Sequence, residues 1–276
     1  MSNIERPLRL AAVGDNCVDI LRPAGRRFIG GNAVNVAVQF ASLGGVSAYF
    51  GAVGEDENGV LTEQSLVRNG VDISRLARRA LPTAYTQIDV AENGERSIGF
   101  EDFGACAGYV PDDDAMAALL GFDHVHIGWL DDGGAVRRHL AAAGISVSQD
   151  TTVNARPENL GVDGLSIAFA SIDGSHDAAR RAADALFARG ARGVVVTRGS
   201  QGSSVFVNGS DADIPARPIV PVDTTGAGDS YIAGFLHALL SGASPELAGE
   251  KAAALAAATC LHEGGFPQHP VATTDS

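Results

Sequence analysis

Residues 223–229 read Asp-Thr-Thr-Gly-Ala-Gly-Asp and lead directly into an apolar stretch that ends at Leu240. Within that stretch the large apolar residues recur with the spacing of one helix face, at Ile232, Phe235, Leu236, Leu239 and Leu240. The pattern predicts two glycines immediately before a helix begins. Unpaired N–H groups and the helix dipole attract anions there, and glycines allow a close backbone approach. We expect Gly226, Ala227 and Gly228 to face a phosphate or a developing negative charge.

Asp229 stands at the edge of this predicted anion site. A carboxylate within hydrogen-bond reach of a substrate hydroxyl can take its proton. An anion site beside a base is the minimal equipment for phosphoryl transfer. The alternative is an ordinary loop in which Asp229 only caps the helix. The length of the string favours the base over the cap.

Strand and helix patterns alternate along most of the chain. Apolar runs predict strands over 8–13, 47–53, 124–129, 145–149, 165–170 and 193–197. Helical spacing predicts helices over 33–43, 60–69, 135–143, 176–189, 230–240 and 245–262, and a late hairpin is expected over 203–207 and near Ile214. Alternating units imply an α/β fold with a doubly wound, mostly parallel central sheet flanked by helices. We expect one domain over 1–266 and a loose C-terminal tail over 267–276.

Residues 83–103 interrupt the alternation. Polar and apolar residues alternate there, and Asn93-Gly94 is a strong hairpin signal. We expect a small antiparallel β lid. Gln87 and Asp89 should share one face of it, because strand side chains alternate. Gln87 is a candidate binding residue if that face covers a substrate; an exposed strand face is the alternative.

The composition excludes several classes of protein. The chain has 276 residues, a formal net charge of −13 and a single lysine, Lys251. No Gly-Lys-Ser/Thr sequence occurs, which excludes a lysine-dependent phosphate loop, and no basic patch points to nucleic acid. Neither a signal peptide nor an apolar run long enough for a membrane span is present. With three widely spaced cysteines, these features predict a cytoplasmic protein.

Two histidines and the only tryptophan fall in one predicted strand. His124 and His126 share a strand face, and His-x-His can bind a metal. No third ligand stands at a useful spacing, so a structural role is favoured. Trp129 follows them and either lines a pocket or packs.

Four segments together resemble one known family. They are Gly-Gly-Asn-Ala-Val-Asn-Val-Ala at 30–37, Gly-Ala-Val-Gly-Glu-Asp-Glu-Asn-Gly at 51–59, Thr-Arg-Gly-Ser-Gln-Gly at 197–202 and the 223–229 string. In order and spacing they are similar to the signatures of the PfkB, or ribokinase-like, carbohydrate kinases. The resemblance implies a ribokinase-like fold and an enzyme that transfers phosphoryl from ATP to a hydroxyl of a small, sugar-like acceptor. It also implies Mg²⁺ as cofactor, with K⁺ as a further candidate.

The resemblance implies roles for single residues. Asp229 would be the catalytic base, helped at the transferred phosphoryl group by Gly226, Ala227 and Gly228. The acceptor side would comprise Asp15, Asp19, Gly31, Asn32, Asn35 and Gln87. The nucleotide side would comprise Ser171, Thr197, Arg198, Gly199 and Gly202. Asp223 and Thr225 match a monovalent-cation site, although turn chemistry is their alternative, as a helix cap is for Asn32. A homodimer through the β lid is a further expectation.

One segment departs from the family pattern. Many members carry Asn-x-x-Glu after the strand expected here at 165–170, and that Glu helps to organise magnesium. This chain has Ser171-Ile172-Asp173-Gly174 instead. Either Asp173 or Asp177 substitutes, or Mg²⁺ is held mainly by the nucleotide and water.

Within the family, residues 14–20, 31–38, 169–171 and 226–230 are most similar to the fructoselysine 6-kinases. Asp15 and Asp19 would suit the ammonium group of a fructosamine, and the acidic chain disfavours an anionic acceptor. The alternatives are another acceptor (ribose, fructose, a nucleoside or a keto-deoxy sugar) or a non-catalytic sensor of sugar or nucleotide. A dinucleotide oxidoreductase is disfavoured because an N-terminal Gly-x-Gly-x-x-Gly is missing.

Overall fold

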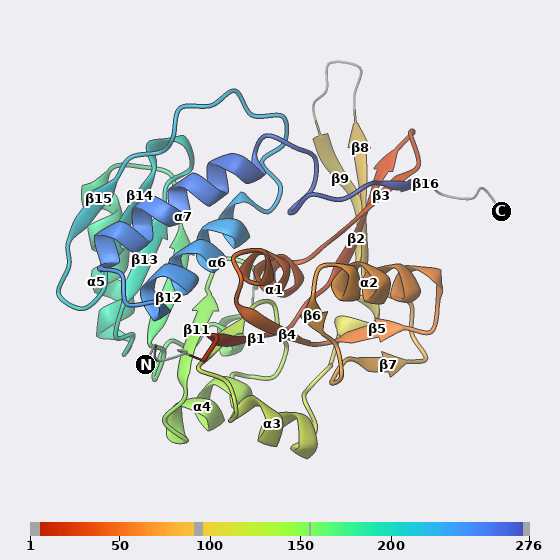
Figure 1. Cartoon of the computed structure of the whole chain (residues 1–276), viewed down its shortest axis with the longest axis horizontal. Coiled ribbons are helices and arrows are strands. Elements are labelled where there is room, and N and C mark those ends of the chain that lie inside the picture. The colour runs from red at the N-terminus through yellow and green to blue at the C-terminus, as the bar shows by residue number, and fades with distance from the viewer. Residues whose placement is uncertain (1–5, 91–95, 155, 273–276) are drawn as a thin grey trace, which may run out of the picture.

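Figure 1 shows the computed structural model of the chain, which describes residues 6–90, 96–154 and 156–272. A nine-stranded sheet forms its centre, in the order β15 (Ala212–Ile214), β14 (Ser203–Phe206), β13 (Val194–Thr197), β12 (Ile167–Ser171), β11 (Ser146–Asp150), β10 (His124–Ile127), β1 (Arg9–Val13), β4 (Val46–Phe50) and β6 (Val71–Asp72). Neighbours from β13 to β6 are parallel, and β14 and β15 complete the sheet as the expected antiparallel hairpin.

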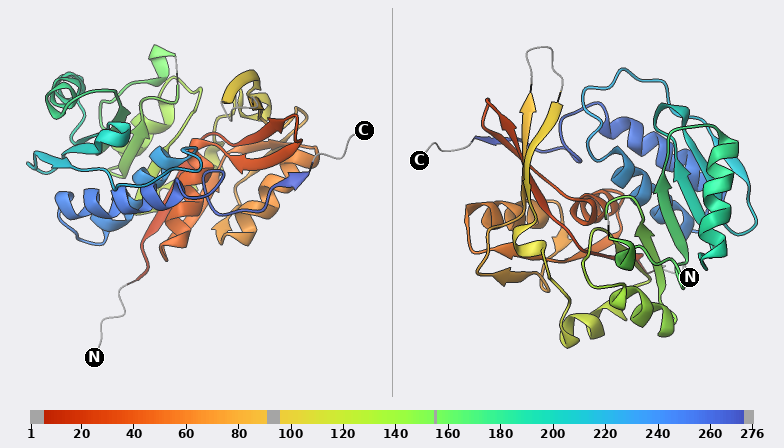
Figure 2. Two further views of the ribbon diagram at one scale, coloured as in Figure 1. Left: turned by 90° about the horizontal axis from the view of Figure 1, so that it is seen from above. Right: turned by 180° about the vertical axis from the view of Figure 1, so that it is seen from behind.

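Helices cover both faces of this sheet (Figures 1 and 2). One face carries α1 (Asn32–Ser42), α6 (Ala227–Leu240) and α7 (Pro245–Thr259), and the other carries α3 (Asp113–Leu119), α4 (Ala135–Ala142) and α5 (His176–Ala188). In β1, Leu10 and Ala12 face the first group, while Ala11 and Val13 face the second. Strands covered on both faces, such as β1 and β13, are mainly apolar, which is why they appeared as short continuous runs. The doubly wound, mostly parallel α/β fold is confirmed.

A second, smaller sheet stands out from the body (Figure 2). Its order is β16 (Val271–Ala272), β3 (Arg26–Gly30), β2 (Cys17–Arg22), β8 (Tyr85–Val90) and β9 (Arg96–Asp102). The antiparallel pair β8–β9 is the lid expected at 83–103, and its predicted Asn93-Gly94 turn lies outside the described residues. The sequence did not reveal β2 and β3, whose mixed polarity lacks a clear period. β2 runs parallel to β8, so the lid is built onto the segment that follows β1.

The C-terminal segment is ordered onto this small sheet as far as Ala272. β16 pairs antiparallel with β3, and the Gln268 amide both accepts from the Ile29 N–H (2.8 Å) and donates to the Ile29 carbonyl (2.8 Å). The expectation of a loose tail over 267–276 is therefore wrong for 267–272. The docking edge belongs to β3, which the sequence did not reveal; residues 273–276 lie outside the described part.

The remaining elements connect the two sheets and the helices. α2 (Glu57–Arg68) packs beside the small sheet, where the buried Arg27 of β3 forms an ion pair with Glu57 (2.9 Å). β5 (Ala52–Gly54) pairs with β7 (Ala77–Arg79), and three single turns of 3₁₀ helix occur, at Gly104–Cys106, Pro157–Asn159 and Gly199–Gln201. Across the described residues, no helix has both the length and the apolar character that a bilayer crossing requires.

Candidate active site

The site lies at the carboxyl ends of β1, β10 and β11. After β1 the chain crosses to β4 on one side, whereas β10 pairs with the other side of β1. Ligands of open parallel sheets bind at such a switch point. Asp15 occupies it, and its carboxylate accepts the backbone N–H groups of Asn32 (2.7 Å), Ala33 (3.2 Å) and Trp129 (3.0 Å). Asp15 therefore ties β1 and β10 to the start of α1.

Asp229 stands in the first turn of α6, which begins at Ala227 and so starts three residues before the predicted helix over 230–240. The residue before the helix, Gly226, has a φ of 72°, and a Cβ there would lie 2.4 Å from the Cα of Gly265. Both facts require glycine at this position. The first turn thus sits against the Gly265 backbone, and the N–H group of Ala227 donates to the Thr224 carbonyl (3.2 Å).

Two asparagines hold the Asp229 carboxylate. The Asn32 amide donates to Asp229 Oδ1 (2.7 Å), and the Asn35 amide donates to Oδ2 (2.6 Å). Asn32 and Asn35 are three residues apart on α1, so they face the same way. Desolvation is the main cause that raises the pKa of Asp229 to about 7; the charges of Asp150 and Asp15 add to it, and the two asparagines oppose it. Asp229 can therefore gain and lose a proton near neutral pH.

Both amide hydrogens of Asn32 are used within the protein, and its amide oxygen has one partner there. Its amide nitrogen also donates to Asp150 Oδ2 (3.1 Å), and its Oδ1 lies 3.1 Å from Nε2 of His126. Asn32 therefore holds Asp229, and its binding of substrate stays a prediction that only the amide oxygen could serve. The sequence analysis did not single out Asp150, which ends β11. The only signal is the alternation of polar residues on that strand, at Ser146, Ser148 and Asp150.

The acceptor side opens over Gly30 and Gly31. Gly31 has a φ of 103°, and a Cβ there would lie 2.6 Å from the Cα of Asn16, so it permits close contact rather than binding through a side chain. A Cβ on Gly30 would lie 3.5 Å from Oδ2 of Asp19 and 3.8 Å from Oδ1 of Asn35. Asp19 and Asn35 therefore border the same space, next to Asp229.

Gln87 is not part of this cluster. In the register of β2 and β8, Gln87 lies opposite Ile20, on the face whose Ile20 and Tyr85 pack with Leu66 of α2 in the core. The opposite face carries Asp19 and, opposite it, Thr86, whose hydroxyl lies 3.1 Å from the sulfur of Cys17. The sequence predicted the strand correctly but chose the wrong face. A shift of one residue reverses every side chain of a strand.

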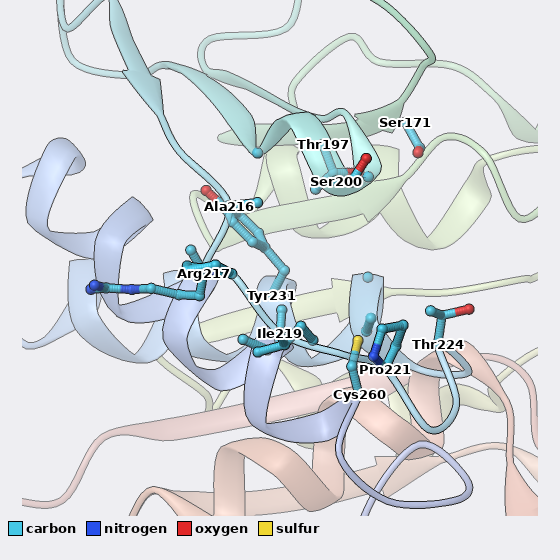
Figure 3. Close-up of a pocket in the computed structure, with 18 residues that line it drawn as sticks. Ser171, Thr197, Ser200, Ala216, Arg217, Ile219, Pro221, Thr224, Tyr231 and Cys260 are labelled. Atoms are coloured by element: carbon cyan, nitrogen blue, oxygen red, sulfur yellow. The ribbon is translucent and has the colours of Figure 1, made fainter.

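A pocket of about 590 Å³ lies on the other side of the α6 N-terminus (Figure 3). Its walls include predicted nucleotide residues, namely Ser171, Thr197, Gly199 and Gly202, and the first turn of α6 closes one end through Ala227 and Gly228. Tyr231, Ala253 and Ile219 supply apolar surface. The pocket and Asp229 thus meet at a single helix N-terminus.

Arg198 does not line that pocket. Its side chain is buried, forms an ion pair with Asp213, and donates to the carbonyl of Ser203 (3.4 Å). The prediction that Arg198 contacts the nucleotide is therefore wrong. Its neighbours Thr197 and Gly199 do line the pocket, and a 3₁₀ helix begins at Gly199, directly after Arg198.

Asp223 and Thr225 stabilise the loop that precedes Gly226. Asp223 Oδ1 accepts from the backbone N–H (3.0 Å) and the hydroxyl (2.8 Å) of Thr225, and its Oδ2 accepts from the N–H of Gly264 (3.0 Å). These contacts are the turn chemistry that was the alternative to a cation site. They connect the loop before α6 to the 264–265 backbone.

The segment at 51–59 supports the lid. Asp56 caps α2 by accepting from the N–H of Gly59 (2.8 Å) and also accepts from the N–H (2.8 Å) and hydroxyl (2.6 Å) of Thr83. Thr83 in turn accepts from the N–H of Gly54 (2.9 Å). This part of the family signature therefore holds the base of β8 in place.

An aromatic pair joins the lid to the body. Phe103, just beyond β9, stacks on Trp129, with ring centroids 4.5 Å apart and planes 20° apart. The N–H of Trp129 donates to Asp15, so this stack borders the acceptor side. Trp129 thus packs against the lid segment.

The described residues contain no group of three or more His, Cys, Asp or Glu side chains that could hold a metal ion. The ring nitrogens of His124 and His126 contact Ser146, Ser148 and Asn32, which gives both histidines the structural role expected of them.

Comparisons with known proteins agree with this geometry. A family model described as "pfkB family carbohydrate kinase" matches residues 9–155 and 163–270. The fructoselysine 6-kinase of Shigella flexneri is 35% identical over 260 residues, covering 93% of this chain and 99% of that protein. The fructosamine kinase FrlD of Bacillus subtilis (strain 168) is 31% identical, covering 94% and 93%. The structure of Arabidopsis thaliana ribokinase complexed with ribose and ATP matches with a TM-score of 0.85, 25% identity and 94% coverage of each chain. The predicted resemblance is confirmed, and the chain belongs to the pfkB family of carbohydrate kinases.

Proposed function

We propose that this kinase transfers the γ-phosphoryl group of ATP to the 6-hydroxyl of a fructosamine such as fructoselysine. The observation that carries the proposal is the position of Asp229. Its carboxylate lies between the pocket that Gly228 lines and the space bordered by Asp19 and Asn35. The similarity to a fructoselysine 6-kinase and to a fructosamine kinase supports this acceptor class.

The reaction needs one proton transfer and one displacement. Asp229 takes the proton of the acceptor hydroxyl while that oxygen bonds to the γ-phosphorus and the bond to the bridging oxygen breaks, which releases ADP. A carboxyl group with a pKa of about 7 is matched to this task at neutral pH. The N–H group of Gly228 would stabilise charge on the transferred group, while that of Ala227 is bonded to the Thr224 carbonyl. Asp229 then loses its proton to solvent.

The cofactors follow from the same site. Because the described residues form no cluster of three metal-binding side chains, we propose that Mg²⁺ enters with the nucleotide and keeps phosphate and water as its main ligands. Stimulation by K⁺ remains a prediction of the Asp223–Thr225 resemblance, measured by replacing K⁺ with a tetraalkylammonium ion. We also propose a cytoplasmic location, since Cys17, Cys106 and Cys260 are free thiols.

A panel of acceptors with ADP release as readout tests the proposal. It contains fructoselysine, fructose, ribose, a nucleoside and 2-keto-3-deoxygluconate. We expect the highest kcat/KM with fructoselysine, and NMR of the product should place phosphate on the 6-oxygen. A clear preference for ribose or a nucleoside would reject the fructosamine and keep the kinase. ATP binding without turnover of any acceptor would favour the sensor.

The homodimer through the lid also remains a prediction. Exposed apolar side chains at the small sheet, Phe100 (48% exposed) and Val271 (38%), support it. Sedimentation velocity of the wild type and of Phe100→Ser checks it, and a concentration-independent monomer would contradict it.

A further inference from the structure

A chain of hydrogen bonds crosses the central sheet beneath Asp229. It starts at Ser146, whose hydroxyl lies 2.9 Å from Nδ1 of His124. Nε2 of His124 is 2.8 Å from the hydroxyl of Ser148, which is 2.9 Å from Nδ1 of His126. Nε2 of His126 then meets Oδ1 of Asn32 at 3.1 Å.

The register of the sheet produces this chain. His124 lies opposite Ser146 and His126 lies opposite Ser148 on the parallel strands β10 and β11. Residues two apart on a strand share a face, so the four side chains form one row. Both histidines and Ser148 are fully buried, with exposures of 1%, 0% and 0%. A buried polar row of this kind is costly unless every member is bonded.

The protons in this row of hydrogen bonds can be assigned by starting at Asn32. Asn32 uses both amide hydrogens, on Asp229 and on Asp150, so its Oδ1 can only accept and Nε2 of His126 must carry a proton. Burial, and to a lesser degree His124, lowers the pKa of His126 to about 3, so the ring is neutral and its Nδ1 must accept from Ser148.

The protons on Ser148 and His124 follow in the same way. The single hydroxyl proton of Ser148 is used on His126, so Ser148 accepts from Nε2 of His124. Burial lowers the pKa of His124 to about 3 as well, which leaves its Nδ1 to accept from Ser146. Every donor in the row therefore points toward Asp229.

We propose that His126 is a positioning residue that fixes the Asn32 amide with its NH₂ group toward Asp229 and thereby keeps Asp229 ionised for catalysis. A reversed amide would turn Oδ1 of Asn32 toward two carboxylates, Asp229 and Asp150. The N–H group of His126 holds the productive orientation, and Ser148 holds the tautomer of His126. This inference rests on the proposed role of Asp229 as base.

The surroundings of Asp229 contain other groups that the same experiment must account for. Asn35 donates from α1, Asp15 faces it from the β1 end, and Asp150 faces it from the β11 end. None of them contacts the His126 ring, which instead meets Phe169 of β12 edge-on at 6.2 Å. A change at His126 therefore reaches Asp229 through Asn32.

Three variants test the proposal in the full-length protein. His126→Leu removes the donor to Asn32, His126→Gln replaces it with an amide N–H, and Ser148→Ala frees the tautomer with the loss of one oxygen. His139→Gln is the matched control, because His139 is exposed on α4. If the Asn32 amide no longer donates to Asp229, the carboxylate loses one charge-assisted hydrogen bond. The acidic limb of the kcat–pH profile should then move to higher pH by about one unit. That shift predicts a loss of turnover of about fivefold at pH 7 in His126→Leu.

The expected pattern is specific. His126→Gln restores most of the turnover, Ser148→Ala shifts the limb in the same direction by less, and KM for ATP is unchanged in all three. His139→Gln behaves as wild type. Equal losses in His126→Leu and His126→Gln, with no shift of the pH limb, would show that His126 only fills space and would overturn the proposal.

Two NMR measurements separate this inference from the proposed function. In the ligand-free wild type, ¹⁵N shifts should show His126 neutral and protonated at Nε2; protonation at Nδ1 would overturn the proposal. ¹³C titration of the Asp229 carboxyl should show a higher pKa in Ser148→Ala and in His126→Leu than in wild type, and an unchanged pKa would also overturn it. Both results hold whether or not any acceptor of the panel is turned over.

Discussion

At the scale of single residues, the meaning of each carboxylate depends on what its oxygens already accept. Asp15 accepts three backbone N–H groups and serves the scaffold. Asp229 accepts two amides in a desolvated position, which leaves its pKa near 7. Asp19 borders the space over Gly30. The predicted base Asp229 and the two predicted acceptor residues Asp15 and Asp19 therefore have three different environments.

Replacing the predicted base tests the chemistry directly. We expect Asp229→Asn to lower turnover by about 10²- to 10⁴-fold, the usual contribution of general-base catalysis. ATP affinity measured by calorimetry should stay close to wild type, because the nucleotide pocket is lined by other residues. Wild-type kcat should rise with pH through about 7, since only the ionised carboxylate accepts a proton. A variant that keeps half of the single-turnover rate would move the base elsewhere.

Because Asp15 already accepts three backbone N–H groups, we propose that Asp19 rather than Asp15 contacts the amine of the acceptor. Asp19→Asn should raise KM for fructoselysine more than KM for fructose, because only fructoselysine carries an amine for the carboxylate to attract. Asp15→Asn should weaken both acceptors and lower the melting temperature, since one face of the new amide would oppose backbone N–H groups. Steady-state kinetics on both sugars, with thermal melts, check this. Equal losses for both sugars in Asp19→Asn would remove the amine contact.

At the scale of elements, one helix N-terminus and one small sheet assemble the site. The first turn of α6 brings Gly228 to the nucleotide pocket and Asp229 to α1. The small sheet brings Asp19 from β2, and the stacked rings of Phe103 and Trp129 join its end to the body. The lid is thus coupled to the acceptor side by an aromatic contact.

Trp129 offers an intrinsic reporter for the lid, because it is the only tryptophan in the chain. We expect acceptor binding to change its fluorescence, since closure of the small sheet would alter the stack with Phe103. Phe103→Ala should remove most of the change while acceptor still binds. An acceptor titration followed by fluorescence, with calorimetry to prove binding, checks this; saturating acceptor without a spectral change would argue against a moving lid.

The C-terminal segment should stabilise the small sheet. Deleting residues 267–276 removes both hydrogen bonds between Gln268 and Ile29 and the β16–β3 pairing. We expect faster hydrogen exchange in β2 and β3 and a higher KM for the acceptor, with the nucleotide affinity unchanged. Gln268→Ala is the milder variant and should show the same direction. Wild-type exchange in the truncated chain would restore the expectation of a loose tail.

At the scale of the whole molecule, the two sheets share one core. Val18 of β2 and Ile29 of β3 belong to the same apolar cluster as Phe40 of α1 and Phe235 of α6. We therefore propose that the chain folds as one unit over 1–266. The site lies across this core, so three carboxyl groups, Asp15, Asp150 and Asp229, have raised pKa values, with desolvation the largest cause in each.

Those raised pKa values predict how stability depends on pH. Between about pH 4 and about pH 7 the folded chain keeps a proton on Asp229 that the unfolded chain has lost. Stability of the ligand-free protein should therefore fall as pH rises through this window. Asp229→Asn carries a pH-independent cost, because its amide opposes the Asn32 or Asn35 donor, but it lacks the titration. The melting temperature of the wild type should thus fall by about 2–4 °C relative to that of the variant between pH 4 and pH 8. Melts followed by circular dichroism and by Trp129 fluorescence should coincide; a wild-type melting temperature that rises from pH 4 to 7 while that of Asp229→Asn stays constant would contradict the sign.

The sequence by itself determined the family, the doubly wound fold and the position of Asp229 at the start of a helix. Glycine turns before a helix and apolar strand runs are local patterns, so Gly226, Gly228 and Asp229 could be assigned without coordinates. The same was true of Ser171 and Thr197, which end the neighbouring strands β12 and β13 and line one pocket.

Only the tertiary structure decided which face each side chain takes and which partner saturates it. Gln87 faces the core because the register of β8 on β2, a long-range choice, sets its side of the sheet. The Arg198 side chain pairs with Asp213, and Asn32 contacts Asp229, Asp150 and His126, which are all distant from it in the sequence. Hydrogen-bond capacity is fixed by residue type, but its use is fixed by neighbours, and neighbours arise only when the strands and helices pack.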